Sequence, residues 1–296
     1  MEKAGHFAIK NEARDGHCSF ASAGSVGERF GEFANFAQQE GLRRLEEVSR
    51  ETVIAYGQEL ADRVENREIS AAYAQNLVSA VNTVMQAATR GQWESVSPTN
   101  EAGIAERSNV RETPAASADR ATYEQARETI SQRGQAIADL ARELGMRSKE
   151  ASLMNARRAA QQAREICSVT ISDGTKGGRP RELENLSEHQ IAALERASTV
   201  QGGDPSMIPA HQSWEQFRNG ELRGTRETLQ QGGIAGLHDL RAGYAADRYE
   251  QLTGHRPPVE GGQVAREIDL AAREQIAAEL GHGRIDVTNS YLGGRG

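Results

Sequence analysis

Apolar residues recur at every third or fourth position along most of the chain, a spacing that predicts amphipathic helices rather than strands. In the first third, three such helices follow one another, with Ser49 and Ser70 as expected N-caps and Gly41 as an expected stop. Their predicted buried faces are Val26, Phe30, Phe33 and Phe36, then Val53, Tyr56, Leu60 and Val64, then Tyr73, Leu77, Val81, Val84 and Ala88. We therefore expect a small helical bundle over residues 19–95.

The flanks of this bundle lack the helical period. Residues 1–18 show no regular apolar spacing and are predicted to form a flexible N-terminal arm. Residues 96–118 contain Pro98, Pro114 and many small polar side chains, which is typical of a linker between domains. A second domain is therefore expected over residues 119–296.

The second domain is predicted to be helical with one interruption. The stretch "ICSVTIS" is short and β-branched, "DGTKGG" has the composition of a turn, and "RPRELENL" can return as a second strand. Helical spacing resumes after Ser187. The expected fold class is mainly α, with a small β-hairpin in the second domain.

Composition narrows the class of protein further. The 296 residues suffice for two ordinary domains, and the formal net charge of −7 argues weakly against a nucleic-acid partner, although a basic groove can exist on an acidic protein. Cys18 and Cys167 form no pairing framework. The N-terminus lacks the apolar core of a signal peptide, and no apolar run approaches the roughly 18 residues of a membrane span. We expect a reduced, cytoplasmic protein.

Several common chemistries have no motif here. The sequence contains no His-Glu-x-x-His, no cluster of thiolates, no phosphate-binding P-loop and no Gly-x-Ser-x-Gly elbow. We therefore expect no metal and no cofactor. Four polar clusters remain in the second domain, at Arg147, at Lys176, at His238 with Arg241, and at His282 with Tyr291.

Each cluster taken alone has an ordinary structural explanation. Arg147 could form a surface ion pair with Glu150, Lys176 could lie in a solvated turn, and Tyr291 could be a terminal aromatic. Together the side chains suit another task. Two arginines can hold the non-bridging oxygens of a phosphodiester, and a tyrosine can attack its phosphorus. A lysine can protonate the leaving 5′-oxygen, and histidines can move the tyrosine proton.

The order and content of the four clusters resemble the tyrosine recombinases, the family of phage and mobile-element integrases. The first arginine box corresponds to Gly145, Met146, Arg147 and Glu150, and the lysine of the hairpin corresponds to Lys176 in "TKGGRPRE". The second box, His-x-x-Arg, is present as "HDLR" from His238 to Arg241. The last box is Leu280, Gly281 and His282, followed by Tyr291 nine residues after the histidine. The relatives most similar in texture are integrases of proteobacterial prophages and integrative elements.

The resemblance implies a function and a set of roles. Residues 19–95 would be a core-binding (SAM-like) DNA-binding domain, and residues 119–296 the catalytic domain of a site-specific recombinase that works through a covalent 3′-phosphotyrosine without metal or ATP. Tyr291 would be the nucleophile, Arg147 and Arg241 the phosphate clamp, and Lys176 the general acid. His238 and His282 would move protons and bond the phosphate.

The same resemblance implies partners. These are double-stranded DNA attachment sites, a homotetramer in the synaptic complex, and accessory DNA-bending or directionality proteins, with the protein on the nucleoid when bound. The expected DNA-contacting residues are Arg157, Arg158, Arg179 and Arg181. Two alternatives stay open: a catalytically silent DNA-binding regulator of the same fold, and a type IB topoisomerase.

Three features depart from the family pattern. Ala242 and Gly243 follow "HDLR" where the family usually has His-Thr, which we expect to affect packing rather than chemistry. An apparent insertion, residues 253–269, lengthens the stretch before His282, and its role is open between DNA contact, subunit contact and none. Only five residues follow Tyr291, where relatives often carry a helix that docks on the next protomer. We expect the active sites to be coupled through another surface.

Overall fold

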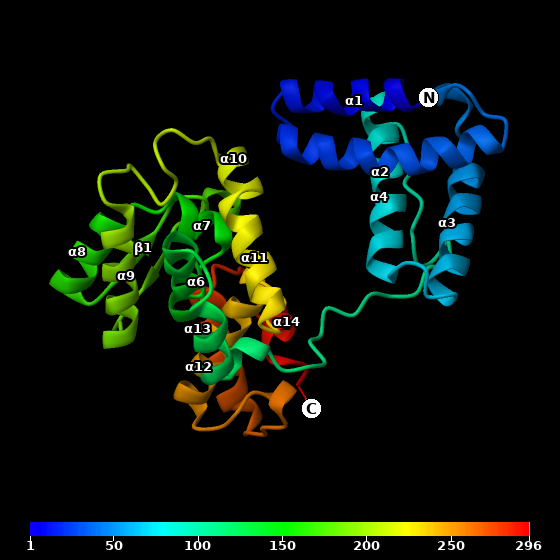
Figure 1. The fold of residues 1–296 in the computed structure, drawn as a ribbon. Coiled ribbons are helices and arrows are strands. Elements are labelled where there is room, and N and C mark those ends of the chain that lie inside the picture. Colours follow the sequence, from blue (N-terminus) through cyan, green and yellow to red (C-terminus); the bar gives the residue numbers. More distant parts are fainter. Residues whose placement is uncertain (296) are drawn as a thin grey trace. The chain divides into compact units, whose positions relative to one another are not determined.

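A computed structural model describes residues 1–295 and divides the chain into two compact units, of which the first is Met1–Ser108 and the second begins at Asn109 (Figure 1). Both units are mostly helical, and the second contains a two-stranded antiparallel sheet. The predicted fold class is therefore confirmed. Within residues 1–295, no helix combines the length and the apolar character needed to cross a membrane.

The first unit is a bundle of four helices. They are α1 (Glu2–Arg14), α2 (Phe20–Gln39), α3 (Arg50–Glu65) and α4 (Ala71–Ala88). Serines begin the last three, because the side chains of Ser19, Ser49 and Ser70 each accept a hydrogen bond from the backbone N–H three residues on. The core of the unit contains the predicted apolar faces, among them Phe30, Phe33, Val53, Tyr56, Leu60, Leu77, Val81 and Val84.

The segment predicted as a flexible arm instead forms helix α1, so that prediction is wrong. Ile9 and Ala13 are buried against the bundle. Gly5 faces the ring of Phe30 so closely that a Cβ there would overlap the ring. Because α1 packs through glycine and alanine as much as through large apolar side chains, the hydrophobic pattern of the sequence carries too little signal to reveal it.

The predicted linker, residues 96–118, is largely bound to the unit on either side of it. Val96, Ala102 and Ile104 are buried in the first unit, where the side-chain amide of Asn82 bonds the N–H and the carbonyl of Val96. The end of the linker packs on the second unit through a 3-10 turn at Ala116–Ala118. Residues 105–115, which contain no helix or strand, connect these two anchored parts.

The second unit surrounds helix α6, whose residues are buried over most of its length. Helices α9 and α12 pack on α6. The elements of the unit in chain order are α5 (Arg120–Arg127), α6 (Gln132–Leu144), α7 (Ser148–Leu153), α8 (Ala156–Ile166), β1 (Val169–Ile171), β2 (Arg181–Leu183), α9 (Glu188–Gln201), α10 (Trp214–Asn219), α11 (Glu221–Gln231), α12 (Leu237–Thr253), α13 (Arg266–Glu279) and α14 (Asn289–Leu292).

The two strands form the predicted hairpin. Val169 pairs with Leu183 and Ile171 with Arg181, and Lys176–Gly178 forms a 3-10 turn at the tip. Gly177 and Gly178 have φ of 74° and 68°, a conformation that glycine adopts without strain. Side chains alternate between the two faces of a strand, so Arg181 and Leu183 both face inward and are buried. The hairpin thus carries one arginine into the interior and presents Lys176 at its exposed tip.

Candidate catalytic site

Side chains from four separate segments of the second unit converge on one place. Arg147 precedes α7, His238 and Arg241 lie on the first turns of α12, His282 follows α13, and Tyr291 lies on α14. The contacts described below join five of the six residues predicted from the sequence. The Lys176 side chain at the hairpin tip makes no hydrogen bond within residues 1–295, but its charge is near enough to contribute to lowering the pKa of His282.

Arg241 is the centre of this arrangement and is only 1% exposed. Its Nε donates to the Tyr291 hydroxyl at 3.1 Å, its Nη1 to the carbonyl of Gly145 at 2.5 Å, and its Nη2 to the carbonyl of Leu280. Burial and the nearby positive charge of Arg147 lower its pKa to about 10, so it remains a cation near neutral pH. The guanidinium is therefore rigidly held and charged.

The backbone conformation and close packing at Gly145 explain why the first box has a glycine at this position. It ends helix α6 with φ of +59°, and a Cβ at this position would lie 2.6 Å from Tyr244 Cδ1 and 2.7 Å from Leu280 Cδ2. The turn directs the Gly145 carbonyl to Arg241 and places Arg147 at the start of α7. A side chain here would separate the two arginine boxes.

The hydroxyl of Tyr291 lies between an arginine and a histidine. It is 3.1 Å from Arg241 Nε and 3.2 Å from His282 Nε2. The rings of His238 and His282 lie 5.4 and 5.7 Å from the tyrosine ring, centre to centre. A phenol in contact with an imidazole nitrogen has a base within reach for its proton.

Both histidines are held in the neutral form. Burial, followed by the charges of Arg241 and Arg147, lowers the pKa of His282 to about 4. Burial and Arg241 likewise lower the pKa of His238. At neutral pH an uncharged imidazole can accept a proton, which an imidazolium cannot. His282 can therefore act as a base toward Tyr291.

Glu150 is a central residue of the site that the sequence motifs alone do not assign a role. Its side chain is 0% exposed and receives a pair of hydrogen bonds from Arg181, at 2.9 and 2.7 Å, and another from Arg147 Nη1 at 2.6 Å. Burial alone would raise the pKa of Glu150, but the bonds from Arg181 and Arg147 hold it at about 2. Glu150 belongs to the first arginine box, three residues after Arg147, and this spacing is the feature of the sequence that could have identified it as a partner of Arg147.

Arg181 has a different role from the one predicted. We expected it to contact DNA, but it is buried, with its Nη atoms on Glu150 and its Nε on the carbonyl of Glu279 at 2.7 Å. Both Nη atoms of this guanidinium are paired with the Glu150 carboxylate, so its charge is already neutralised within the protein and is not offered to a phosphate of the DNA backbone. Arg181 is buried because side chains alternate between the two faces of strand β2 and Arg181 lies on the inward face. A cluster of arginines in the sequence does not show which of its members faces inward.

Asp239 in the second box attaches the linker to the site. It accepts hydrogen bonds from Arg111 Nη2 at 2.5 Å and from the backbone N–H of Ser117 at 3.1 Å. Gly243, one of the departures from the family pattern, lies so close to Ser117 that a Cβ would be 2.7 Å from its Oγ. The small residues after "HDLR" thus let α12 pack tightly on the linker turn.

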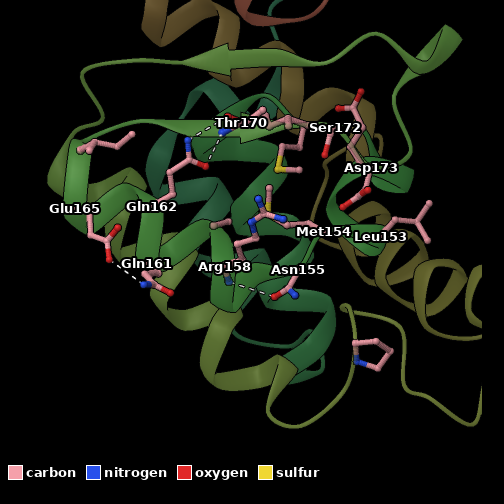
Figure 2. A pocket seen from close by; sticks show the side chains of 16 residues that line it. Leu153, Met154, Asn155, Arg158, Gln161, Gln162, Glu165, Thr170, Ser172 and Asp173 are labelled. Atoms are coloured by element: carbon pink, nitrogen blue, oxygen red, sulfur yellow. Dashed lines mark hydrogen bonds between the residues drawn. The ribbon is translucent and has the colours of Figure 1, made fainter.

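The remaining predicted DNA contacts lie on the surface. Arg157, Arg158 and Arg179 are exposed. A groove of about 760 Å³ runs between α8 and β1, and Figure 2 shows Arg158, Gln162 and Glu165 along it. Glu150 lines this groove, whereas Tyr291, Arg241 and His282 do not.

The charges of the cluster determine which ligand it suits. Arg147, Arg181 and Arg241 all lie beside one carboxylate, Glu150, and Lys176 is near His282, so among the described residues the site carries an excess of positive charge. A phosphodiester would offset that excess. Within residues 1–295, no group of three or more His, Cys, Asp and Glu side chains is placed to hold a metal ion.

Comparison with known proteins was made at the level of sequence and of structure. A family model described as Integrase matches residues 105–247. A search of curated protein sequences finds no match. A lambda integrase dimer bound to a COC′ core site is similar in fold, with a TM-score of 0.63 and 14% identity, over 98% of this chain and 96% of that one.

Two further solved structures extend the similarity. The Tn1549 transposon integrase in complex with transposon right-end DNA has a TM-score of 0.60 at 12% identity, over 98% of this chain and 95% of that one. A lambda integrase tetramer bound to a Holliday junction has a TM-score of 0.58 at 15% identity, over 95% and 77%. Together these findings show that residues 105–247 match the Integrase family model and that the chain has the fold of these integrases.

Proposed function

We propose that this recombinase cleaves and rejoins DNA at specific sites, with Tyr291 as the nucleophile that forms a covalent 3′-phosphotyrosine. One observation carries the assignment: the Tyr291 hydroxyl lies 3.1 Å from Arg241 Nε and 3.2 Å from His282 Nε2. The contact with Arg241 places beside the hydroxyl a cation that can also bind a phosphate, and the contact with His282 places beside it a base that can accept its proton.

The proposed chemistry follows from this placement. The Tyr291 oxygen attacks phosphorus, its proton passes to His282, and the bond from phosphorus to the 5′-oxygen breaks. Lys176 donates a proton to that leaving oxygen. Arg147 and Arg241 hold the non-bridging oxygens, where negative charge grows in the transition state.

Rejoining is the reverse of cleavage. A 5′-hydroxyl attacks the phosphotyrosine, Lys176 takes up its proton, and the Tyr291 phenol leaves with a proton from His282. The phosphotyrosine linkage conserves the energy of the broken phosphodiester bond, so rejoining requires no external energy source such as ATP. His238, whose ring is packed against Tyr291, would bond the phosphate.

The two units suggest how the protein holds DNA. Residues 19–95 would form the core-binding domain and residues 119–296 the catalytic domain, and each would contact the duplex. Exposed Arg157, Arg158 and Arg179 would contact backbone phosphates. The lambda integrase tetramer on a Holliday junction supports a homotetrameric synapse here, with accessory DNA-bending or directionality proteins and binding to the nucleoid as further parts of the proposal.

A nicked suicide duplex tests the proposal. The duplex is built on an attachment site identified by searching the DNA that flanks the gene for inverted repeats, and it is nicked so that the short strand beyond the cleavage point dissociates and traps the intermediate. We expect a covalent protein–DNA adduct with the wild-type chain and none with Tyr291→Phe. A wild-type chain that binds but forms no adduct would be the silent regulator. Relaxation of a supercoiled plasmid that lacks the repeats would instead indicate a topoisomerase.

A further inference from the structure

Helix α13 carries an arginine that the proposed chemistry does not use. Arg273 is 0% exposed, although arginine is among the residues least often buried in proteins. It does not contact Arg147, Arg241 or either histidine of the site. A buried cation requires partners that offset its desolvation, and its partners show what it does.

The guanidinium of Arg273 holds the segment on both sides of Tyr291. Nη1 donates to Thr288 Oγ1 at 3.2 Å and to Asn289 Oδ1 at 3.0 Å, before the tyrosine. Nη2 donates to the carbonyl of Gly293 at 3.1 Å, after it. One rigid, planar group therefore fixes the start and the end of the same short element.

This element cannot keep its position unaided. Helix α14, Asn289–Leu292, has four residues, far below the roughly 12 that an isolated helix needs to be even marginally stable. Its place is decided by tertiary contacts. The backbone N–H of Arg111 adds one, donating to the carbonyl of Asn289 at 2.9 Å.

Arg273 is itself held by a buried carboxylate. Its Nε donates to both oxygens of Asp269, at 2.8 and 3.0 Å, and Asp269 also accepts from the Tyr249 hydroxyl at 2.8 Å. Asp269 ends the apparent insertion, residues 253–269. Val259 in the same insertion lies against Gly293, where a Cβ would be 2.9 Å from the Val259 backbone nitrogen. The insertion thus supports the segment that carries Tyr291.

We propose that Arg273, oriented by Asp269, is a positioning residue that fixes helix α14 so that the Tyr291 hydroxyl stays between Arg241 and His282. The inference rests on the proposed role of Tyr291 as nucleophile. Attack requires the phenol oxygen close to phosphorus and in line with the leaving oxygen, and a misplacement of about 1 Å can cost about 100-fold in rate. The residue acts through Tyr291 and does not touch the DNA.

Three variants separate positioning from general support of the fold. Arg273→Gln removes the charge and the planar pair of Nη donors that bond Thr288, Asn289 and Gly293. Arg273→Lys keeps a cation opposite Asp269 but cannot reach three acceptors with a planar group. Arg266→Gln is the matched control, because Arg266 is an exposed arginine on the same helix.

Two measurements are made on each variant. The first is the single-turnover rate of adduct formation on the nicked duplex at saturating protein, together with the Kd for the same duplex. The second is amide hydrogen exchange in the absence of DNA, compared between the segment 285–295 and the segment 140–150 before Arg147. Exchange reports local opening of each segment separately.

We expect Arg273→Gln and Arg273→Lys both to slow cleavage by about 100-fold while the Kd stays within about twofold of wild type. Exchange should rise in 285–295 and stay unchanged in 140–150. Arg266→Gln should match wild type in all respects. The lysine variant is the most informative, since a residue needed only for its charge would be rescued by it.

Two outcomes would overturn the proposal. Cleavage by Arg273→Lys at the wild-type rate would show that the paired Nη hydrogen bonds to the ends of α14 are dispensable. Faster exchange in both segments would show that Arg273 supports the unit as a whole. A wild-type chain without adduct contradicts the proposed function instead, and the exchange data, obtained without DNA, then decide alone whether Arg273 fixes α14.

Discussion

Substitution of the buried carboxylate Glu150 tests how the site is held together. Glu150→Gln keeps the size of the side chain but removes the charge that joins Arg147 to Arg181. Two routes give the magnitude. A pKa of about 2 against the ordinary 4.5 corresponds to about 3 kcal/mol in favour of the charged form. Removing one partner of a buried ion pair costs about 3–5 kcal/mol in other proteins. We expect a loss of about 3 kcal/mol in the free energy of unfolding.

The loss should depend on pH in a defined direction. The pKa of Glu150 is lower in the folded chain than in the unfolded chain, so its contribution is complete above pH 4.5 and disappears as the pH falls toward about 2. The difference between wild type and Glu150→Gln should therefore be constant from pH 7 to pH 5 and shrink below that. Other carboxylates titrate in both proteins and cancel in the difference.

Urea unfolding followed by tryptophan fluorescence measures this difference. Trp214 lies in the second unit and Trp93 in the first, so a Trp93→Phe background makes the signal report on the second unit alone. Glu274→Gln, at an exposed position on α13, is the control and should change the free energy of unfolding by less than about 0.5 kcal/mol. A Glu150→Gln loss below about 1 kcal/mol, or one that persists unchanged at pH 3, would refute the reasoning.

Four further expectations concern the reaction and the backbone. Lys176→Ala should slow cleavage of a normal 5′-oxygen linkage at least about 100-fold more than that of a 5′-thio linkage, because a thiolate leaves without a proton; equal slowing would remove Lys176 from the acid role. The pH profile of kcat/KM should lose activity on the acid side near pH 4, where His282 becomes charged, and a limb at pH 6.5 would contradict its burial. DNA affinity should fall steeply with salt, and a flat response would argue against phosphate contacts. Gly145→Ala should lower the Tm of the second unit, since its Cβ would overlap Tyr244 and Leu280; an unchanged Tm would show that the turn can relax.

Local pattern predicted most of the secondary structure. The apolar spacing around Phe30, Tyr56 and Leu77 reflects one buried face on each helix, and this face is present in the bundle. The exception is α1, where Gly5 packs against Phe30 of α2 and His6 packs against Gly27 of α2. Glycine makes such contacts by having no side chain, so a hydrophobic pattern does not register them.

The candidate reaction groups were also predictable, because each box is short. One turn fixes Gly145 with Arg147 and one helix fixes His238 with Arg241, whereas His282 and Tyr291 are nine residues apart and depend on tertiary contacts for their placement. The order of the boxes then suggested that they meet. Their convergence on Arg241 is what the structure adds.

The supporting groups became visible only in the tertiary structure. Arg181 reads as one more cation of a surface cluster, and Arg273 as a polar residue of an amphipathic helix. Their partners, Glu150 for the first and Asp269, Thr288, Asn289 and Gly293 for the second, lie on other elements or in other turns. Local spacing in the sequence predicted most of the helices, and the resemblance of four short boxes to the tyrosine recombinases supplied the candidate reacting side chains. Which arginines hold the site together was decided by folding, because a buried guanidinium pairs with the acceptors that tertiary packing places beside it.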